Sequence, residues 1–419
     1  MLRRRRPPSS RRSTPRRSLR SWIWRGALAL GAVTLGLLSV GGSFARLVEG
    51  VDPARAAVLA PGNGVILAAS AQQEFTMAPS EASDSNPARL ARLALLRDPT
   101  AVDALNVLGL QAQLRGETER ARDIFQYSLR LSRRELRPQI WAIEEAVNRG
   151  DIAAALRSYD IALRTSREAP GLLLPNLVAA LAEPKVRSGL LPILASDPVW
   201  TESFLQRVAT SGIAPTAGVA FFREGEAIDL PVTDDLRAAL VNGLLAEGET
   251  RQAWSYYSEF RRGAVRNRSR DPDFALNADI RAAFDWMPGA LAGGSAAILQ
   301  AGEGGILDFS LPPGNGGTLV QQTQLLPPGS YRISGRSRGI DQAERSRPYW
   351  VLLCQDGREL GRVEVPNSDV ANGEFAGRIS VPGDCAVQTL SLIARASDDI
   401  AGVSGQIERA MLVPAGAVE

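Results

Sequence analysis

The sequence predicts a multidomain α + β protein with a single N-terminal transmembrane helix, an α-helical repeat domain and a C-terminal antiparallel β-sandwich. Three observations predict this class: an uncharged run near the N-terminus, a 34-residue internal repeat, and two-residue alternation of apolar side chains in the last third. We divide the chain into an Arg-rich tail (1–25), a transmembrane helix (26–45), a linker with a partial helix (46–87), a helical domain (88–285) and a β-sandwich domain (286–419).

The N-terminal region carries a topology signal. Ten arginines and no acidic residue lie between Met1 and Arg25, and the uncharged run Gly26 to Ala45 follows. At about 1.5 Å per residue this run makes a helix of about 30 Å, the thickness of a bilayer's hydrocarbon core. Arginines stay on the cytoplasmic side, so we expect a cytoplasmic N-terminus and the bulk of the chain across the membrane. Cleavage after Ser43-Phe44-Ala45 is the alternative, but the apolar run is longer than in most signal peptides.

Charge separates the tail from the rest of the chain. The formal net charge is +3, but taking the ten tail arginines from 48 basic residues leaves 38 against 45 acidic ones, so residues 46–419 carry about −7. No aromatic residue that could stack on bases is interleaved before Ser21, so we expect no nucleic-acid partner. The arginines instead fit a topology signal that also contacts anionic lipid of the inner membrane.

The composition leaves little room for catalysis. The chain contains no histidine, which excludes Ser-His-Asp and Cys-His catalysis and histidine-bearing metal sites. Its one lysine, Lys185, follows no Gly-rich phosphate-binding loop. We therefore expect a protein that is not an enzyme, and predict no catalytic, cofactor-binding or metal-binding residues. A glycosidase or lyase acting through paired carboxylates is the alternative.

The middle of the chain contains an internal repeat. The repeated positions are Gly116, Ala121 and Phe125, then Gly150, Ala155 and Tyr159, then Gly248, Ala253 and Tyr257, with the pair Leu108-Gly109 ahead of the first set. This pattern resembles a tetratricopeptide repeat, in which glycine turns the chain between paired helices, alanine lets the helices approach, and the aromatic residue fills the space toward the next repeat. The resemblance implies a curved surface that binds a protein partner. An ordinary helical domain with coincidental spacing is the alternative.

Other helices are expected around the clear repeats. We expect one around Val65–Glu74, inside the linker. Residues 167–235 fit the repeat poorly, but Pro170–Leu181, Lys185–Leu194 and Val199–Ala209 have helical patterns.

The last third changes to a strand pattern. Residues 290–305 contain clustered glycines, which are typical of loops. From Ile306 apolar and polar residues alternate, and the strands expected from this alternation include 306–311, 331–335, 349–355, 375–381, 387–394 and 405–413. Asp356-Gly357 predicts a two-residue hairpin with a type I′ turn.

The only two cysteines, Cys354 and Cys385, both fall in this last third. In an oxidising compartment a lone pair within one small domain favours a disulfide, with two buried thiols as the alternative.

The order of pieces in the last third resembles jelly-roll carbohydrate-binding modules. The similar segments are 319–339, with a strand, a Pro-Gly turn and a second strand, and 405–414, which is similar to the closing strand. The resemblance implies glycan contact through exposed aromatic rings with polar groups beside them. Candidate residues are Tyr349, Trp350, Arg336, Arg338 and Asp356. For each aromatic residue, we favour a place in the core over contact with a sugar.

The whole chain is similar to tetratricopeptide-containing proteins found with exopolysaccharide or capsule production in alphaproteobacteria. The segments that carry the resemblance are SRRELRPQIW and NRGDIAAALRSYDIALRT, with the terminal sandwich. It implies a non-enzymatic scaffold at the inner membrane, with its bulk in the periplasm, whose repeats bind a protein and whose sandwich binds polysaccharide. A protein-interaction scaffold of another envelope machine, without sugar binding, is the alternative.

Overall fold

The computed structural model describes residues 19–302 and 304–416, so residues 1–18 of the Arg-rich tail lie outside the described residues. The chain forms two compact units, Met1–Ser166 and Arg167–Glu419. The second unit contains both the later helices and the sandwich. The contacts that join them are described below.

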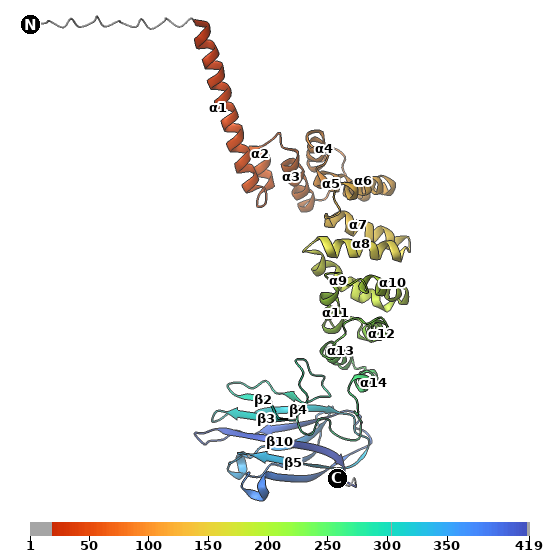
Figure 1. The fold of residues 1–419 in the computed structure, drawn as a ribbon, viewed down its shortest axis with the longest axis vertical. Helices are drawn as coiled ribbons and strands as arrows, with labels where there is room; N and C mark the ends of the chain where they lie inside the picture. The colour runs from red at the N-terminus through yellow and green to blue at the C-terminus, as the bar shows by residue number, and fades with distance from the viewer. Residues whose placement is uncertain (1–18, 303, 417–419) are drawn as a thin grey trace, which may run out of the picture. The chain divides into compact units, whose positions relative to one another are not determined.

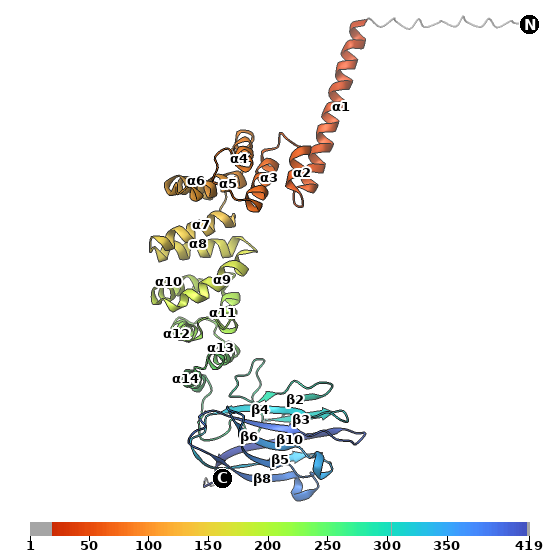
Figure 2. The ribbon, with the colours of Figure 1, turned by 180° about the vertical axis from the view of Figure 1, so that it is seen from behind.

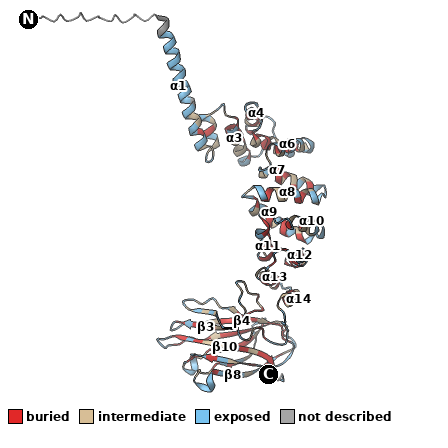
Figure 3. Cartoon of the chain, viewed as in Figure 1, coloured by how far each residue is buried: buried red, intermediate tan, exposed pale blue. Residues whose placement is uncertain are grey.

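The first unit begins with the long helix α1 (Leu19–Val48), which contains the predicted span 26–45 (Figure 1). Its segment Trp22–Val48 has a mean hydropathy of 1.8 and is long and apolar enough to cross a membrane. The helix is coloured as exposed along nearly its whole length in Figure 3. An N-terminal helix of this kind is either a membrane anchor or a signal sequence.

Two helices occupy the segment 46–87, where we expected a linker with a partial helix. They are α2 (Pro53–Leu59) and α3 (Gly64–Met77), and α3 covers the expected helix. The side-chain oxygens of Asp52 and Asn63 accept hydrogen bonds from the first-turn amides of α2 and α3, so each helix has an N-cap. The sequence of α3 has a weak helical period because it is buried on more than one face, against α4 (Asn86–Arg97) and α5 (Val102–Leu114).

Three glycine turns have the same geometry. The helices joined by these turns are α5 and α6 (Thr118–Leu131), α7 (Leu136–Asn148) and α8 (Ile152–Thr165), and, in the second unit, α13 (Asp234–Ala246) and α14 (Thr250–Phe260). Gly116, Gly150 and Gly248 have φ of +74°, +72° and +79°. In each turn the amide after the glycine donates to the carbonyl five residues earlier, at 2.9, 2.8 and 2.8 Å. This Schellman geometry needs a left-handed residue, and glycine adopts it without strain.

The alanine and aromatic positions of the repeat also behave alike. Ala121, Ala155 and Ala253 are buried, as are Phe125 and Tyr257, while Tyr159 and Leu108 are half-buried. An added Cβ on Gly109 would lie 2.7 Å from Cζ of Phe125, so the absence of a side chain there lets α5 and α6 approach.

The second unit starts with helices that the repeat pattern does not describe well. They are α9 (Ala169–Ala179) with the 3₁₀ turn η1 (Ala180–Ala182), α10 (Pro184–Leu194), α11 (Thr201–Thr210) and α12 (Pro215–Glu226). The first three match the expected helices, whereas α12 was not expected. It begins after Ala214, which has a left-handed backbone, with a proline at its first position. The helix is short and contains glycines, which weaken its sequence signal.

Two antiparallel five-stranded sheets form the predicted β-sandwich (Figures 1 and 2). Sheet A has the order β1-β4-β9-β6-β7, and its strands are β1 (Met287–Pro288), β4 (Gly317–Gln324), β9 (Gln388–Ala394), β6 (Tyr349–Cys354) and β7 (Glu359–Glu364). Sheet B has the order β2-β3-β10-β5-β8, and its strands are β2 (Ser295–Ala301), β3 (Gly304–Leu311), β10 (Val403–Pro414), β5 (Gly329–Arg338) and β8 (Glu374–Val381). Both sheets bury their inner faces in one core that contains Trp286, Trp350 and Phe309.

One strand lies where we expected a loop. β2 runs through the 290–305 segment and pairs with β3 along its length. The glycines flank this strand, and Ala296 and Ile298 alternate with exposed residues and pack against the core. The clustered glycines were therefore strand boundaries, not a continuous loop.

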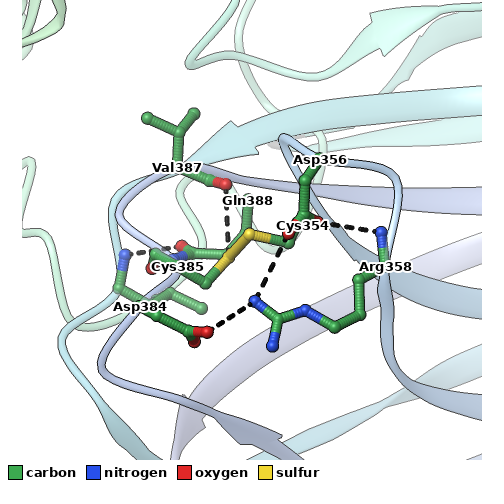
Figure 4. Close-up of a disulfide and its surroundings, with 8 residues drawn as sticks. Cys354, Asp356, Arg358, Asp384, Cys385, Val387 and Gln388 are labelled. Atoms are coloured by element: carbon green, nitrogen blue, oxygen red, sulfur yellow. Dashed lines mark hydrogen bonds and ion pairs between the residues drawn. A yellow bond between two sulfur atoms is a disulfide. The ribbon is translucent and has the colours of Figure 1, made fainter.

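The predicted disulfide joins Cys354 at the end of β6 to Cys385 before β9 (Figure 4). Beside it, the β6–β7 hairpin corrects the predicted type I′ turn. Cys354 N donates to Arg358 O, and only Gly357 of the turn has a positive φ, of +85°. The loop therefore has three residues, with glycine at the left-handed position of a bulge. Arg358 lies between the carboxylates of Asp356 and Asp384, at 3.4 and 3.1 Å.

The contact of Gly109 with Phe125 gives a test of the repeat packing. The Phe125 ring is fully buried and stacks on Trp141 with centroids 4.8 Å apart, so it has no room to move. We expect Gly109→Ala to lower the free energy of unfolding by about 1–3 kcal/mol, although alanine ordinarily favours a helix interior. Denaturant unfolding of the full chain in detergent, followed by circular dichroism, measures this. Gly62→Ala, whose added Cβ meets nothing within 4 Å, is the control. Equal effects of the two substitutions would contradict the packing account.

Candidate functional site

The first unit has a groove lined by α3, α5 and α7, the first helix of each successive pair. We call it the repeat groove. It has a volume of about 380 Å³. Residues from three helices line it: Ala69, Gln72, Gln73, Thr76 and Met77 of α3, Asp103 of α5 and Arg137 of α7. The groove thus combines an exposed methionine with amide, hydroxyl and charged groups.

Asp103 is the electrostatic feature of the repeat groove. Burial raises the pKa of the Asp103 carboxyl above its ordinary value, and the positive charge of Arg137 offsets part of that rise. Burial, and then the charge of Asp103, likewise raise the pKa of Glu135. A partly desolvated carboxylate opposite an arginine can recognise the paired donors and acceptors of a peptide.

The second unit has a larger groove on the outer face of sheet B, which we call the sheet-B groove. Its volume is about 930 Å³. The groove is lined by Arg268 and Asp273 before the sandwich, Arg332, Ser334, Gly335 and Arg336 of β5, Ala371, Glu374, Phe375 and Ala376 at the β8 edge, and Glu408, Arg409, Met411 and Val413 of β10.

Local backbone features shape the sheet-B groove. The pairing of β10 with β5 shifts register between Ile407 and Arg409, so Glu408 is the extra residue of a bulge. Gly335 lies so close to Arg409 O that an added Cβ would be 2.1 Å from it. The segment before the sandwich forms one wall, because Ala410 N donates to Pro272 O at 2.9 Å.

The charges of the sheet-B groove are four arginines and three carboxylates. Arg409 pairs with Asp273 at 2.9 Å, and Arg336 lies 3.7 Å from Glu374. For Arg268 and Arg332, residues 19–302 and 304–416 provide no ion pair within 4 Å. The groove therefore offers guanidinium groups to a ligand, and these donate paired hydrogen bonds to carboxylates.

Trp350 is not available to a sugar, which corrects its place among the glycan candidates. Its side chain is 0% exposed and lies in the sandwich core, between Trp286 at 5.5 Å and Phe375 at 6.4 Å. The reason is that side chains alternate along β6, and Trp350 lies on the face of the strand that points into the core.

The other glycan candidates do not come together at one site. Tyr349 lies on the outer face of sheet A, with the guanidinium carbons of Arg362 and Arg395 at 4.2 and 4.6 Å from its ring centroid. Asp356 is in the β6–β7 hairpin beside the disulfide. Only Arg336 lines the sheet-B groove, and the exposed Arg338 is two residues further along the same strand.

A polar junction between α13, α14 and the sandwich was not predicted from the sequence. The hydroxyl of Tyr257, a repeat residue, donates to Oδ1 of the buried Asp285 at 2.7 Å. Arg270 Nε donates to Phe284 O at 2.8 Å and its Nη1 to Gln324 at 3.1 Å. Burial lowers the pKa of Arg270 to about 10. Arg270 and Asp285 lie in a segment without periodicity, so their burial could not be predicted from the sequence.

Asn242 of α13 completes this junction. Its side-chain amide donates to Arg281 O at 3.0 Å and accepts from Ala283 N at 2.7 Å. The segment 281–286 therefore covers the last helix pair, where another repeat would otherwise pack. Over the described part of the chain, no group of three or more His, Cys, Asp or Glu side chains is arranged to hold a metal.

No family model and no curated protein matches this chain. Among solved structures, the chain is similar to the carbohydrate-binding module CBM6cm-2 of Cellvibrio mixtus lichenase 5A in complex with cellotriose (10% identity, 30% of this chain and 88% of that chain, TM-score 0.20). It is also similar to the APC/C hetero-tetramer Cut9–Hcn1 (13% identity, 55% and 46%, TM-score 0.28). A third is the enzymatically active domain of bacteriophage CBA120 tailspike protein 4 (12% identity, TM-score 0.23), where the match covers 30% of this chain and spans 19% of the tailspike chain.

The raised pKa of Asp103 predicts a pH-dependent stability effect. The pKa of Asp103 is higher in the folded state than in the unfolded state, so folding favours the protonated carboxyl. The contribution of Asp103 to stability is therefore fully present below the ordinary value of 3.8 and is lost as pH rises through the raised pKa. We therefore expect Asp103→Asn, which cannot ionise, to unfold at higher denaturant concentration than the wild type at pH 7, with the difference shrinking as pH falls. The exposed Asp123→Asn of α6 is the control and should have little effect. Wild-type stability above that of Asp103→Asn at pH 7 would contradict the desolvation of Asp103.

Proposed function

We propose that this protein is a membrane-anchored, non-enzymatic adaptor of cell-envelope polysaccharide assembly or export. In this proposal α1 stays in the inner membrane with the N-terminus in the cytoplasm, and the rest of the chain lies in the periplasm. The repeat groove binds a protein partner, and the sheet-B groove binds a glycan.

An uncleaved anchor is supported by the packing of Ala45. This residue precedes the bond that a signal peptidase would cut, yet it is 0% exposed and packs against Ala56 within a continuous helix. A peptidase needs its substrate accessible and extended. The long apolar run argues in the same direction.

The observation that carries the glycan proposal is the charge and size of the sheet-B groove. A volume of about 930 Å³ is within the range of ligand-binding clefts, about 300–1,000 Å³. Arg332 and Arg268 form no ion pair with any described residue, and Arg336 lies 3.7 Å from Glu374. We therefore propose that the ligand is an acidic polysaccharide, whose carboxylates replace the missing partners of these arginines.

A protein partner at the repeat groove is supported by the lining of that groove. Exposed Met77 offers an adaptable apolar contact, and Gln72, Gln73 and Asp103 offer hydrogen-bonding groups beside it. Such a mixture suits a short peptide segment better than a sugar or a small cofactor.

A second candidate is a scaffold that binds proteins only. The observation in its favour is that Phe375, the aromatic residue named in the lining of the sheet-B groove, is 5% exposed and packs its ring on Trp350 in the core. Sugar-binding grooves commonly use exposed rings to cover pyranose faces, and this groove would have to act through charge and hydrogen bonds alone.

Affinity electrophoresis of the detergent-solubilised full chain distinguishes these candidates. We expect gels that contain the source cell's acidic polysaccharide to retard the wild type. Arg332→Ala should reduce the retardation strongly, because it removes a guanidinium group that would bind the ligand. The fold should be retained, because Arg332 forms no ion pair with the described residues. The matched control is Arg345→Ala, on the same sandwich, whose exposed ion pair with Asp398 contributes little to stability.

Unchanged mobility of the wild type in every polysaccharide would remove the glycan role and leave the protein scaffold. Equal loss in Arg332→Ala and Arg345→Ala would show that retardation reflects overall charge and not the sheet-B groove. Circular dichroism of each variant checks that the fold is retained.

A further inference from the structure

An uncharged, exposed segment lies directly beside α1. We call it the α2–α3 tip and define it as residues 56–65, from the second half of α2 to the start of α3. No charged residue occurs between Arg55 and Glu74. Within the tip, Val58 is 80% exposed, and Leu59 and Val65 are each 46% exposed. Exposed apolar side chains grouped in this way mark an interaction surface.

The packing of α2 against α1 fixes the position of this tip along α1. Ala45 and Ala56 pack together with Ile66 in one buried cluster. Nearer the membrane end, an added Cβ on Gly41 would be 3.3 Å from Leu59 O. α2 therefore runs back along α1, with Ala56 beside Ala45 and Leu59 beside Gly41. Figures 1 and 2 both show α2 lying against the end of α1.

The uncharged run of α1 then sets the depth of the tip. Residues 26–45 make about 30 Å of helix, which fills the hydrocarbon core. Arg25 and Arg46 bound this run and lie at the two surfaces. The stretch from Gly41 to Ala45, about 6 Å of helix, is the outermost part of the span. Because Leu59 lies beside Gly41, the tip reaches the same depth.

We propose that the α2–α3 tip inserts into the outer part of the bilayer beside α1 and is a second membrane contact of the chain. This inference rests on the proposed membrane anchor. It assigns the lipid of the same bilayer as the partner, with Val58 and Leu59 in contact with acyl chains near the headgroups. Helices that lie at this boundary bury their apolar side about 5–10 Å into it.

The distribution of charge around the tip favours lipid over a protein partner. Asp52 and Arg55 form an ion pair at 2.9 Å at the opposite end of α2, where the headgroups and water would be. The surface of the tip also continues onto exposed apolar residues of α1, such as Phe44 and Leu47. A protein partner at this depth would have to lie within the membrane and exclude lipid from both helices.

The test uses a fluorophore on single introduced cysteines in the full chain. The native cysteines are joined in a disulfide and do not react. Val58→Cys and Val65→Cys report on the tip, Leu35→Cys on the middle of α1, and Val147→Cys on exposed α7. Each labelled chain is placed in nanodiscs of phosphatidylcholine and phosphatidylglycerol, with quencher-bearing lipids that carry the quenching group near the headgroup or deep in the acyl chain.

We expect loss of emission from Val58→Cys and Val65→Cys with the shallow quencher, loss from Leu35→Cys with the deep quencher, and no loss from Val147→Cys. Emission retained at both tip positions while Leu35→Cys is quenched would overturn the tip contact and leave the anchor intact. Emission retained at Leu35→Cys as well would show that the anchor proposal itself fails. Quenching of Val147→Cys to the same extent as Val58→Cys would also overturn the inference, because the contact would not be specific to the tip.

Discussion

The second unit depends on the buried pairing of Arg270 with the segment that covers the last helix pair. A helical repeat ends with an apolar face that a further repeat would bury, and here residues 281–286 bury it. Arg270 connects this segment to β4 through Phe284 O and Gln324, and its guanidinium carbon lies 5.4 Å from the centroid of the Trp254 ring of α14. Its lowered pKa, about 10, still leaves it charged at neutral pH, and Asp285 supplies the nearby negative charge. Replacing Arg270 would leave the buried oxygens of Phe284 and Gln324 without these hydrogen bonds, at a cost of about 1–3 kcal/mol for each unsatisfied group.

Arginine has three different physical roles along this chain. In the tail it supplies a one-sided positive charge, on which the proposed membrane orientation rests. On the helices it pairs with carboxylates, as Arg122 does with Glu145 at 2.6 Å between α6 and α7. In the sheet-B groove the guanidinium of Arg332 lacks an ion pair among the described residues and faces open space. The body of the chain carries about −7 overall, so a local concentration of arginine is needed for any acidic polymer to bind there.

Local signals allowed much of the fold to be predicted. The turns at Gly116, Gly150 and Gly248 could be predicted because a left-handed backbone position strongly favours glycine, which is visible in the sequence. The alternation of apolar residues predicted most strands, and the presence of a lone pair of cysteines in one small domain predicted the disulfide. Features that depend on distant segments could not be predicted. The pattern of β6 does not say that Trp350 faces the core, and nothing local brings Arg268 and Asp273 beside β5 and β10. The sheet-B groove therefore became visible only in three dimensions, and only Arg336 of its residues was anticipated.

The proposed function depends most directly on whether the sheet-B groove binds an acidic glycan through charge. Isothermal titration calorimetry of the full chain in detergent, with matched neutral and uronic-acid-containing oligosaccharides of equal length, measures this at several salt concentrations. We predict that the acidic oligosaccharide binds, that its affinity falls as salt rises, and that the neutral one does not bind, because salt screens exposed charges over about 10 Å at 0.1 M. Equal binding of the two oligosaccharides, or an affinity for the acidic one that salt does not change, would contradict it.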